Sequence, residues 1–511
     1  MFSRILIANR GEIAVRIIRA CREMNISPAV VFSSADRSSL AVRLADCACF
    51  IGEAPAVESY LDIDRILAAA RDLEADAIHP GYGFLSENPL LVRACSEAGI
   101  TFIGPSAESM EMMGDKVRAR TSVASAGVPV VPGSDRSLDS VDEAAQVAGA
   151  IGYPVMLKAR AGGGGKGIRV IRSEEELKQA FVLTRGEAEA SFRDSRVFLE
   201  KVVARPRHIE VQILGDRFGN LVHIGERECS IQRRHQKIVE ECPSPRVGRA
   251  FREKLGEAAL LAARASGYSN AGTVEFLVEG SSRAQVPPFY FLEINARLQV
   301  EHPVTEMVYG VDLVKEQIRM AAGERLKLEQ GRLIPRGAAV ECRVYAEDPA
   351  NDFVPSPGTI STLLEPAGPG VRVDSGVFQG ATVPVDYDPL VSKLIAWGAD
   401  RPEALQRMSR ALREYKVAGV ATTLPFFRVL FAHPDFQQGD LSTRFLEEHG
   451  LLNVLGPPLD HAVDAAVIGA ALDYYLEAGR ANSSPPGRPS SPWKRDALER
   501  GLRSGPWGLK Q

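Results

Sequence analysis

The chain has 511 residues, and its 61 Lys and Arg nearly balance 65 Asp and Glu, giving a formal net charge of −4. This balance argues against a protein held to nucleic acid by its overall charge, and no apolar run approaches the ~20 residues of a membrane span. With 45% hydrophobic and 25% charged residues, the chain is typical of globular proteins and long enough for about three domains. Seven scattered cysteines without a CxxC pair favour a reduced, cytoplasmic compartment.

The first part of the chain, residues 1–114, alternates short β-prone runs with helical patterns. Strands are predicted at 5–7, 29–32, 77–78 and 101–103, which indicates a doubly wound parallel-sheet α/β domain. Such domains often bind dinucleotides. The first turn, Asn9-Arg-Gly-Glu12, lacks the GxGxxG pattern, and this argues against nicotinamide binding.

Three further regions follow. Residues 115–330 form a second predicted domain, in which residues from about 131 to 203 look like a compact insert with its own strands. Residues 331–447 open with an alternating strand and form a third, mixed domain, so that the whole is a multidomain α/β and α+β protein. Residues 448–511 hold a helical stretch near 465–476 and then a Pro/Ser-rich tail.

A glycine run at residues 162–167 lies between two β-prone runs at 155–158 and 168–171. Backbone N–H groups of a glycine loop can approach phosphates closely because no side chain is in the way. The Walker pattern GxxxxGK[ST] is absent, so the run predicts a different phosphate cover, a mobile lid, with Lys158 just before it. The alternative is a flexible hairpin tip.

The most informative run, residues 289–303, alternates apolar and polar residues. Alternation predicts that one side of an extended segment carries two carboxylates, two amides and a guanidinium, from Glu293, Asn295, Arg297, Gln299 and Glu301. Such a side would suit metal ions and a small anion. The alternative is the solvated face of an amphipathic strand.

Glu275 and Glu293 lie on two apolar β-prone runs separated by a turn at 279–288. Pairing of these runs as a hairpin would bring together two carboxylates, the hard ligands that Mg²⁺ prefers, whereas without a cation the like charges would be destabilising. A basic cluster at 233–237 could place His235 and Lys237 beside a polyanionic substrate as charge compensation, or form a surface patch.

Together these motifs strongly resemble those of biotin carboxylases, the ATP-grasp ligases that carboxylate biotin with bicarbonate. The matching segments span about residues 1–447: IANRGEIA (7–14), HPGYGFLSEN (79–88), FIGP (102–105), MGDK (113–116), GGGGKG (162–167), CSIQRRHQK (229–237), EINARLQVEHPVTE (293–306), ECRVYAEDP (341–349) and FVPSPG (353–358). The resemblance implies an N-terminal domain, an ATP-grasp domain with a mobile lid, and a C-terminal biotin carboxylase domain.

The resemblance also implies the role of each matching position. It assigns to the ATP site Lys116, Lys158, Gly163, Gly164, Gly165, Lys166, Gly167, Glu200, Lys201, His235, Glu275 and Glu293. It assigns to two Mg²⁺ or Mn²⁺ ions Glu275, Glu293 and Asn295, and to bicarbonate Lys237, Arg297, Gln299 and Val300. Glu301 corresponds to the general base and Arg343 to the group that stabilises the biotin enolate, with Tyr82 and His208 near the biotin ring. Alternation points Val300 away from this site, so we expect the strand to break before it.

The sequence has no biotinylation tetrapeptide containing Met-Lys-Met and no carboxyltransferase region. Biotin is therefore expected on a separate biotin carboxyl carrier protein, in an acetyl-CoA or other acyl-CoA carboxylase with carboxyltransferase subunits, or in a pyruvate carboxylase. A homodimer is a family expectation. Two departures from the family, Arg160 and a longer turn at 279–288, touch no catalytic position.

Two other functions compete with this interpretation. One is another ATP-grasp ligase, making carbamoyl phosphate or joining amino acids, against which HPGYGFLSEN and Glu301 stand. The other is a catalytically silent nucleotide-binding regulator. Such a regulator is expected to have lost some of the catalytic side chains, and the chain retains Glu275, Glu293, Arg297, Glu301 and Arg343.

Overall fold

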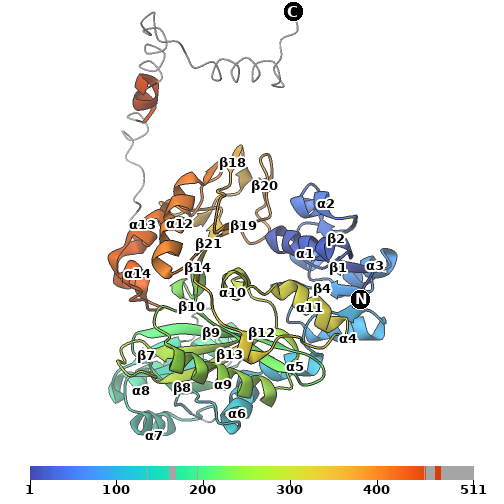
Figure 1. Ribbon diagram of the computed structural model, residues 1–511. Helices are drawn as coiled ribbons and strands as arrows, with labels where there is room; N and C mark the ends of the chain where they lie inside the picture. The colour runs from blue at the N-terminus through green and yellow to red at the C-terminus, as the bar shows by residue number, and fades with distance from the viewer. Residues whose placement is uncertain (135, 160–167, 193, 454, 456–465, 474–511) are drawn as a thin grey trace, which may run out of the picture. The chain divides into compact units, whose positions relative to one another are not determined.

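The computed structural model describes residues 1–134, 136–159, 168–192, 194–453, 455 and 466–473 (Figure 1). The chain divides into two units, Met1–Leu455 and Gly456–Gln511. In the second unit residues 466–473 are helical, within the stretch predicted at 465–476, and the Pro/Ser-rich run lies outside the described residues. Among the described residues, none of the helices has the length and apolarity to cross a membrane.

A five-stranded parallel sheet forms the N-terminal part, in the order β3-β2-β1-β4-β5. Its strands are β1 (Arg4–Ile7), β2 (Ser27–Ser33), β3 (Cys47–Gly52), β4 (Ala77–His79) and β5 (Thr101–Phe102), and the helices between them are α1 (Gly11–Glu23), α2 (Leu40–Leu44), α3 (Ile63–Asp72) and α4 (Pro89–Glu97). Because neighbouring strand residues face opposite sides, Ile5 packs with α1 and Leu6 with α3 and α4. The doubly wound prediction is confirmed. Sequence reasoning missed the edge strand β3, which begins with the small, partly exposed residues Cys47, Ala48 and Cys49 and ends in a glycine, so only Phe50 and Ile51 have high β propensity.

The insert has its own antiparallel sheet of β6 (Val155–Ala159), β7 (Ile168–Ile171) and β8 (Val197–Lys201), in the order β7-β6-β8. Helices α7 (Val141–Ile151) and α8 (Glu174–Phe192) pack on it around a core that includes Leu157 and Leu199. Lys158 is paired with Ile168 across β6 and β7, so the predicted hairpin is confirmed. Its tip, residues 160–167 with Arg160 and the glycine run, lies outside the described residues.

An eight-stranded antiparallel sheet is the largest layer, in the order β13-β12-β9-β10-β11-β14-β21-β19. Its strands are β9 (Pro206–Gly215), β10 (Leu221–Arg233), β11 (Gln236–Cys242), β12 (Asn270–Glu279), β13 (Phe289–Asn295), β14 (Ala338–Tyr345), β19 (Val371–Ser375) and β21 (Leu390–Gly398). Val239 of β11 pairs with Cys342 of β14, so one sheet continues across the boundary predicted near residue 330. The domain boundaries themselves stay predictions.

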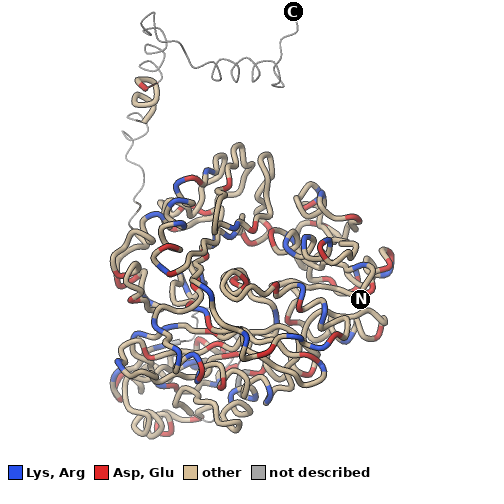
Figure 2. Tube along the Cα trace, in the orientation of Figure 1, with Lys and Arg blue, Asp and Glu red and all other residues tan. Residues whose placement is uncertain are grey.

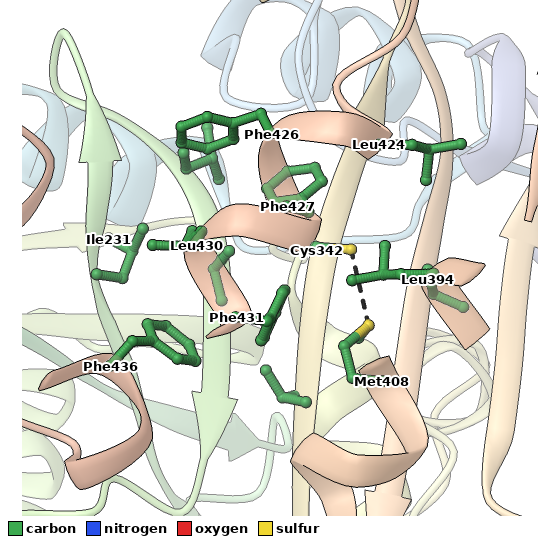
Figure 3. Close-up of a cluster of buried hydrophobic side chains, with 14 of the residues drawn as sticks. Ile231, Cys342, Leu394, Met408, Leu424, Phe426, Phe427, Leu430, Phe431 and Phe436 are labelled. Atoms are coloured by element: carbon green, nitrogen blue, oxygen red, sulfur yellow. Dashed lines mark hydrogen bonds between the residues drawn. The ribbon is translucent and has the colours of Figure 1, made fainter. Parts of the chain in front are cut away.

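Helices cover this sheet at both ends. Near β9 and β12 lie α5 (Ala107–Gly114), α6 (Lys116–Ser125) and α9 (Arg249–Ala265), and near β14 lie α10 (His302–Tyr309), α12 (Arg401–Glu414) and α13 (Leu424–Ala432). Figure 3 shows Cys342 of β14 inside an apolar cluster, with its Sγ 3.9 Å from Met408 Sδ. Since strand residues alternate, Arg343 points to the opposite face. The packing of this core therefore fixes where Arg343 lies.

The remaining elements are short: α11 (Leu313–Ala321), α14 (Pro434–Gln438), α15 (Phe445–Glu448), β15 (Glu347–Asp348), β16 (Val354–Pro355), β17 (Gly358–Thr359), β18 (Thr362–Leu364), β20 (Thr382–Val383), β22 (Lys416–Ala418) and 3₁₀ turns at Ser34–Asp36, Ala56–Glu58, Gln330–Arg332 and Leu451–Asn453. Figure 2 shows basic and acidic residues interspersed along the described chain, in keeping with its nearly balanced charge.

Candidate functional site

Glu301 lies between β13 and α10 and is 0% exposed. One of its carboxylate oxygens is 2.9 Å from Lys237 Nζ, and the other is 2.9 Å from Arg343 Nη2. Burial alone would raise the pKa of this carboxyl, but the cations Lys237, Arg343 and Arg227 outweigh burial and hold the pKa well below its ordinary value. Glu301 is therefore ionised at neutral pH and available as a base.

Lys237, on β11, is the centre of the charged cluster. Its Nζ donates to Glu210 at 2.6 Å, Glu275 at 2.7 Å and Glu301 at 2.9 Å. Burial opposes the charge on Lys237, yet these three carboxylates hold its pKa well above the ordinary value. Because Glu301 also has Arg343 as a partner, Lys237 can contact an incoming anion without leaving Glu301 unpaired.

Glu275 and Glu293 face each other at one register position of the β12–β13 hairpin, so the predicted pairing is confirmed. Glu275 accepts a hydrogen bond from Asn295 Nδ2 at 2.8 Å and lies 2.9 Å from His208 Nε2. Burial would raise the pKa of Glu275, but Lys237 and His208 hold it well below the ordinary value. Two opposed carboxylates and an amide oxygen are a donor set that fits a hard divalent cation.

The run after β13 departs from the predicted extended segment. The strand ends at Asn295, because the chain turns there toward α10, so alternation is wrong for Arg297 to Glu301. The break before Val300 is confirmed. Arg297 nonetheless lies beside its predicted neighbours: Nη1 donates to Gln299 Oε1 at 2.8 Å and Nη2 to Asn295 Oδ1 at 3.2 Å.

Two features of Arg297 and Gln299 indicate how these side chains could hold an anion. Arg297 Nε donates to Glu87 Oε2 at 2.9 Å, which fixes the plane of the guanidinium. Gln299 Nε2 is buried and makes no hydrogen bond within the described part of the chain. A buried donor without a partner costs free energy, so this amide is ready to donate to a bound group.

Arg343, on β14, contacts two acids. Its Nε donates to Glu240 Oε1 at 2.7 Å, and its Nη2 reaches Glu301. Burial raises the pKa of Glu240 to about 7, although Arg343 opposes the shift. The arginine is thus anchored by Glu240 on one side and directed at Glu301 on the other.

The two positions predicted near the biotin ring lie close to this cluster. His208 Nδ1 is 2.9 Å from Gln232 Nε2, which also donates to the Cys229 carbonyl at 2.9 Å. Because an amide nitrogen only donates, Nδ1 of His208 is the acceptor in this contact, and its Nε2 lies 2.9 Å from a Glu275 carboxylate oxygen. The ring of Tyr82 lies 5.8 Å from Lys393 Nζ, and its buried hydroxyl makes no hydrogen bond within the described residues.

The predicted ATP residues divide between described and undescribed parts. Lys158 forms an ion pair with Glu200, which also pairs with Arg120 at 2.8 Å. Lys201 Nζ donates to the carbonyl of Gly152 at 2.7 Å, and His235 is exposed in the turn between β10 and β11. Lys116 begins α6, but its side chain lies outside the description, as do Gly163, Gly164, Gly165, Lys166 and Gly167.

Family models match nearly the whole first unit. The model "Biotin carboxylase, N-terminal domain" matches residues 1–110, and "Biotin carboxylase C-terminal domain" matches residues 341–448. Between them, "Carbamoyl-phosphate synthase L chain, ATP binding domain" matches residues 115–329. The chain belongs to the biotin carboxylase family. It is an ATP-dependent ligase of the biotin-carboxylating type.

Known biotin carboxylases are similar along the same span. The biotin carboxylase of Nostoc sp. is 53% identical over 447 residues, which cover 88% of this chain and 99% of that protein. A pyruvate carboxylase subunit from Methanothermobacter thermautotrophicus is 52% identical over 449 residues, 88% of this chain and 90% of that protein. The biotin carboxylase domain of Hydrogenobacter thermophilus 2-oxoglutarate carboxylase, solved with MgADP, ADP and bicarbonate, has a TM-score of 0.82 at 47% identity and covers 89% of this chain and 99% of its own.

Sequence reasoning missed several members of this biotin carboxylase site. Glu210 and Arg227 lie on β9 and β10, long strands whose buried charges no motif marks. Gln232 lies within the CSIQRRHQK segment but was given no role, and Glu240 stands out in the sequence only as an acid beside the basic cluster. The available signal was a charged residue within an otherwise apolar strand, because a buried charge needs a partner. Arg227, fully buried between Glu210, Gln212 and two threonines, is the clearest case.

Proposed function

We propose that this chain carboxylates biotin carried on a separate carrier protein, using ATP and bicarbonate, as the first half-reaction of an acyl-CoA carboxylase. The observation that carries the proposal is the buried carboxylate of Glu301, held 2.9 Å from both Lys237 and Arg343. This arrangement supplies a base with a depressed pKa, an anion-binding cation on one side and an oxyanion-stabilising cation on the other.

In the proposed reaction, bicarbonate lies against Lys237, Arg297, Gln299 and the backbone of Val300, with its hydroxyl toward Glu301. Glu301 takes the hydroxyl proton, which turns a poor nucleophile into one able to attack the γ-phosphate of ATP. The attack displaces ADP and gives carboxyphosphate, which decomposes to CO₂ and phosphate. Phosphate takes the N1′ proton of biotin while Arg343, beside Tyr82 and His208, stabilises the charge that develops on the ureido oxygen. N1′ then attacks CO₂ and gives carboxybiotin.

The ATP site is proposed at Lys116, Lys158, Glu200, Lys201 and His235 with the glycine run 163–167, and the metal ligands at Glu275, Glu293 and Asn295. Mg²⁺ or Mn²⁺ bound there would neutralise charge on the phosphates. Lys158, which forms an ion pair with Glu200, supplies a cation one residue before the end of β6 and close to the hairpin tip. Cover by that tip would keep water from carboxyphosphate.

The acyl-CoA context and the partners are part of the proposal. A carrier protein, carboxyltransferase subunits and a homodimer are expected from the family. The 52% identity to a pyruvate carboxylase subunit favours pyruvate as a second candidate acceptor. Reconstitution with each type of carboxyltransferase subunit, followed by transfer of ¹⁴C from bicarbonate, distinguishes acyl-CoA from pyruvate.

The test of the reaction is ADP release by the purified chain with Mg²⁺, ATP, free biotin and bicarbonate. Release is expected to depend on bicarbonate and to fall about 10²–10⁴-fold in Glu301→Gln, the range for loss of a general base. Glu253→Gln, an exposed charge change on α9, is the matched control. ADP release that does not depend on bicarbonate would overturn the mechanism. Turnover by Glu301→Gln at the wild-type rate would show that Glu301 is not the base.

A further inference from the structure

We propose that His433, Asp435 and His449 form a binding site for a single transition-metal dication of the Zn²⁺ type, apart from the catalytic centre. One candidate ligand atom from each of the three side chains lies within 4.8 Å of the others. Two imidazoles and a carboxylate are a donor set that suits Zn²⁺ and similar ions, whereas Mg²⁺ prefers oxygen ligands alone.

Local sequence brings the three side chains together. Pro434 cannot continue α13, so the helix ends at Ala432 with His433 as its C-cap. His433 also caps the start of α14, and Asp435 lies in the first turn of that helix. His449 is the C-cap residue directly after α15. The short connection between α14 and α15 therefore folds back and sets the second imidazole beside the first.

Packing holds both rings in place. The ring centroids of His433 and His449 are 4.5 Å apart, and the ring of Phe445, 1% exposed, lies 5.4 Å from the first and 4.5 Å from the second. Fixed ligands lower the entropic cost of binding an ion. The side chains of His449 and Asp435 remain 23% and 42% exposed, so an ion can enter from solvent and keep a water ligand.

The present contacts between these groups are weak and easily exchanged. His449 Nε2 lies 3.6 Å from Asp435 Oδ2, and the amide of Asp435 donates to His433 Nδ1 at a long 3.3 Å. Coordination by either nitrogen of His433 ends that hydrogen bond, because a neutral imidazole has one lone pair to give. A tetrahedral ion with Zn–N of about 2.0 Å would draw its ligands to about 3.3 Å from one another.

The proposed metal site lies next to the start of strand β9, which carries residues of the catalytic centre. The connection between Asp435 and His449 contacts the start of β9: Thr443 N donates to the Pro206 carbonyl at 2.9 Å, and the Arg207 guanidinium donates to the Gly439 carbonyl. Strand β9 continues to His208 and Glu210. An ion that joins the two ends of this connection would stabilise its folded form and, through it, β9.

The experiment measures Zn²⁺ affinity of the full chain, freed of metal and kept in excess Mg²⁺, by competition with a chromophoric chelator. One Zn²⁺ per chain is expected, with affinity reduced at least about tenfold in Asp435→Asn and more in His433→Asn/His449→Gln. Glu447→Gln, which removes an exposed carboxylate from α15 without removing a ligand, is the matched control.

A second cluster that could hold an ion, His208, Glu210 and Glu275, belongs to the catalytic centre and must be separated in the same experiment. His208→Asn is expected to retain the Zn²⁺ affinity. Co²⁺ in place of Zn²⁺ should give visible bands of tetrahedral coordination in wild type and His208→Asn, and none in the double variant. Circular dichroism checks that each variant is folded. Equal Zn²⁺ affinity in wild type and a folded double variant, or loss of that affinity in His208→Asn, would overturn the proposal.

Discussion

Lys393 Nζ donates a hydrogen bond to the carbonyl of Val300 at 2.8 Å, and so holds the backbone directly before Glu301. Lys393 lies on β21, is 0% exposed, and is 3.2 Å from Glu12 of α1. One buried ammonium therefore joins the N-terminal helix, the large sheet and the loop that carries the proposed base. The contact of Val300 uses its carbonyl, which does not depend on where its side chain points.

Replacing Lys393 with Met is expected to destabilise the first unit by about 3–5 kcal/mol, because Glu12 would remain buried without its ion-pair partner. Burial already raises the pKa of Glu12 to about 7 with Lys393 in place. Denaturant unfolding of wild type and variant measures the difference.

The matched control for this prediction is the double variant Lys393→Met/Glu12→Gln. It removes both charges, so most of the lost stability should return. A double variant as unstable as the single one would show that the loss came from packing and not from the charge of Glu12.

Gly376→Ala is expected to destabilise the chain by about 1–3 kcal/mol through overpacking. A Cβ at this position would lie 2.5 Å from the backbone N of Glu12 and 2.7 Å from the carbonyl carbon of Gly11, atoms that cannot rotate away. α1 would have to move from β19. Gly331→Ala, where nothing lies within 4 Å, is the control, and equal melting temperatures for the two variants would contradict the prediction.

The sequence was sufficient for the parts of the fold that depend on local pattern. The Glu275–Glu293 pair could be predicted because two alternating runs joined by a turn allow few registers. The path after Asn295 could not, since alternation predicts a face only while the chain remains a strand. The assignment of Arg297 to bicarbonate and of Glu301 to the base comes from the resemblance and not from the periodicity, and it stays a prediction.

The charged partners were hidden because they are distant in sequence. Glu301 is 64 positions from Lys237 and 42 from Arg343, and Arg343 is 103 positions from Glu240. No periodicity within one segment connects such residues, and only the order of strands in the sheet brings them together. A charged residue within an apolar strand predicts that a partner exists, but not which residue it is.

Glu87→Gln is expected to raise the KM for bicarbonate about tenfold with a smaller change in kcat, if Arg297 binds bicarbonate as proposed. Glu87 accepts from Arg297 Nε and from the backbone N of Ala296, both at 2.9 Å. Loss of a charge-assisted hydrogen bond costs about 1.5–3 kcal/mol, which is about tenfold or more in binding.

Bicarbonate-dependent ADP release over a range of bicarbonate concentrations measures this effect. Glu53→Gln, an exposed acid in the same N-terminal part, is the control. An unchanged KM for bicarbonate in Glu87→Gln would mean that the guanidinium keeps its position without Glu87, or that Arg297 does not bind the anion.

Glu341 is expected to make stability fall as pH rises above the ordinary carboxyl pKa. Both of its carboxylate oxygens are buried without a hydrogen-bond partner among the described residues. Burial raises its pKa well above the ordinary value, against the opposing charge of Lys393. The folded state then keeps a proton that the unfolded state has lost, so unfolding releases a proton and the free energy of unfolding decreases by up to about 1.4 kcal/mol per pH unit. Glu341→Gln stays neutral at every pH and should remove this slope.

The measurement is denaturant unfolding of both proteins from about pH 5 to about pH 8, with Glu253→Gln as the exposed control. Parallel stability curves for wild type and Glu341→Gln would show that Glu341 is ionised in the folded state, stabilised by a cation such as Lys393.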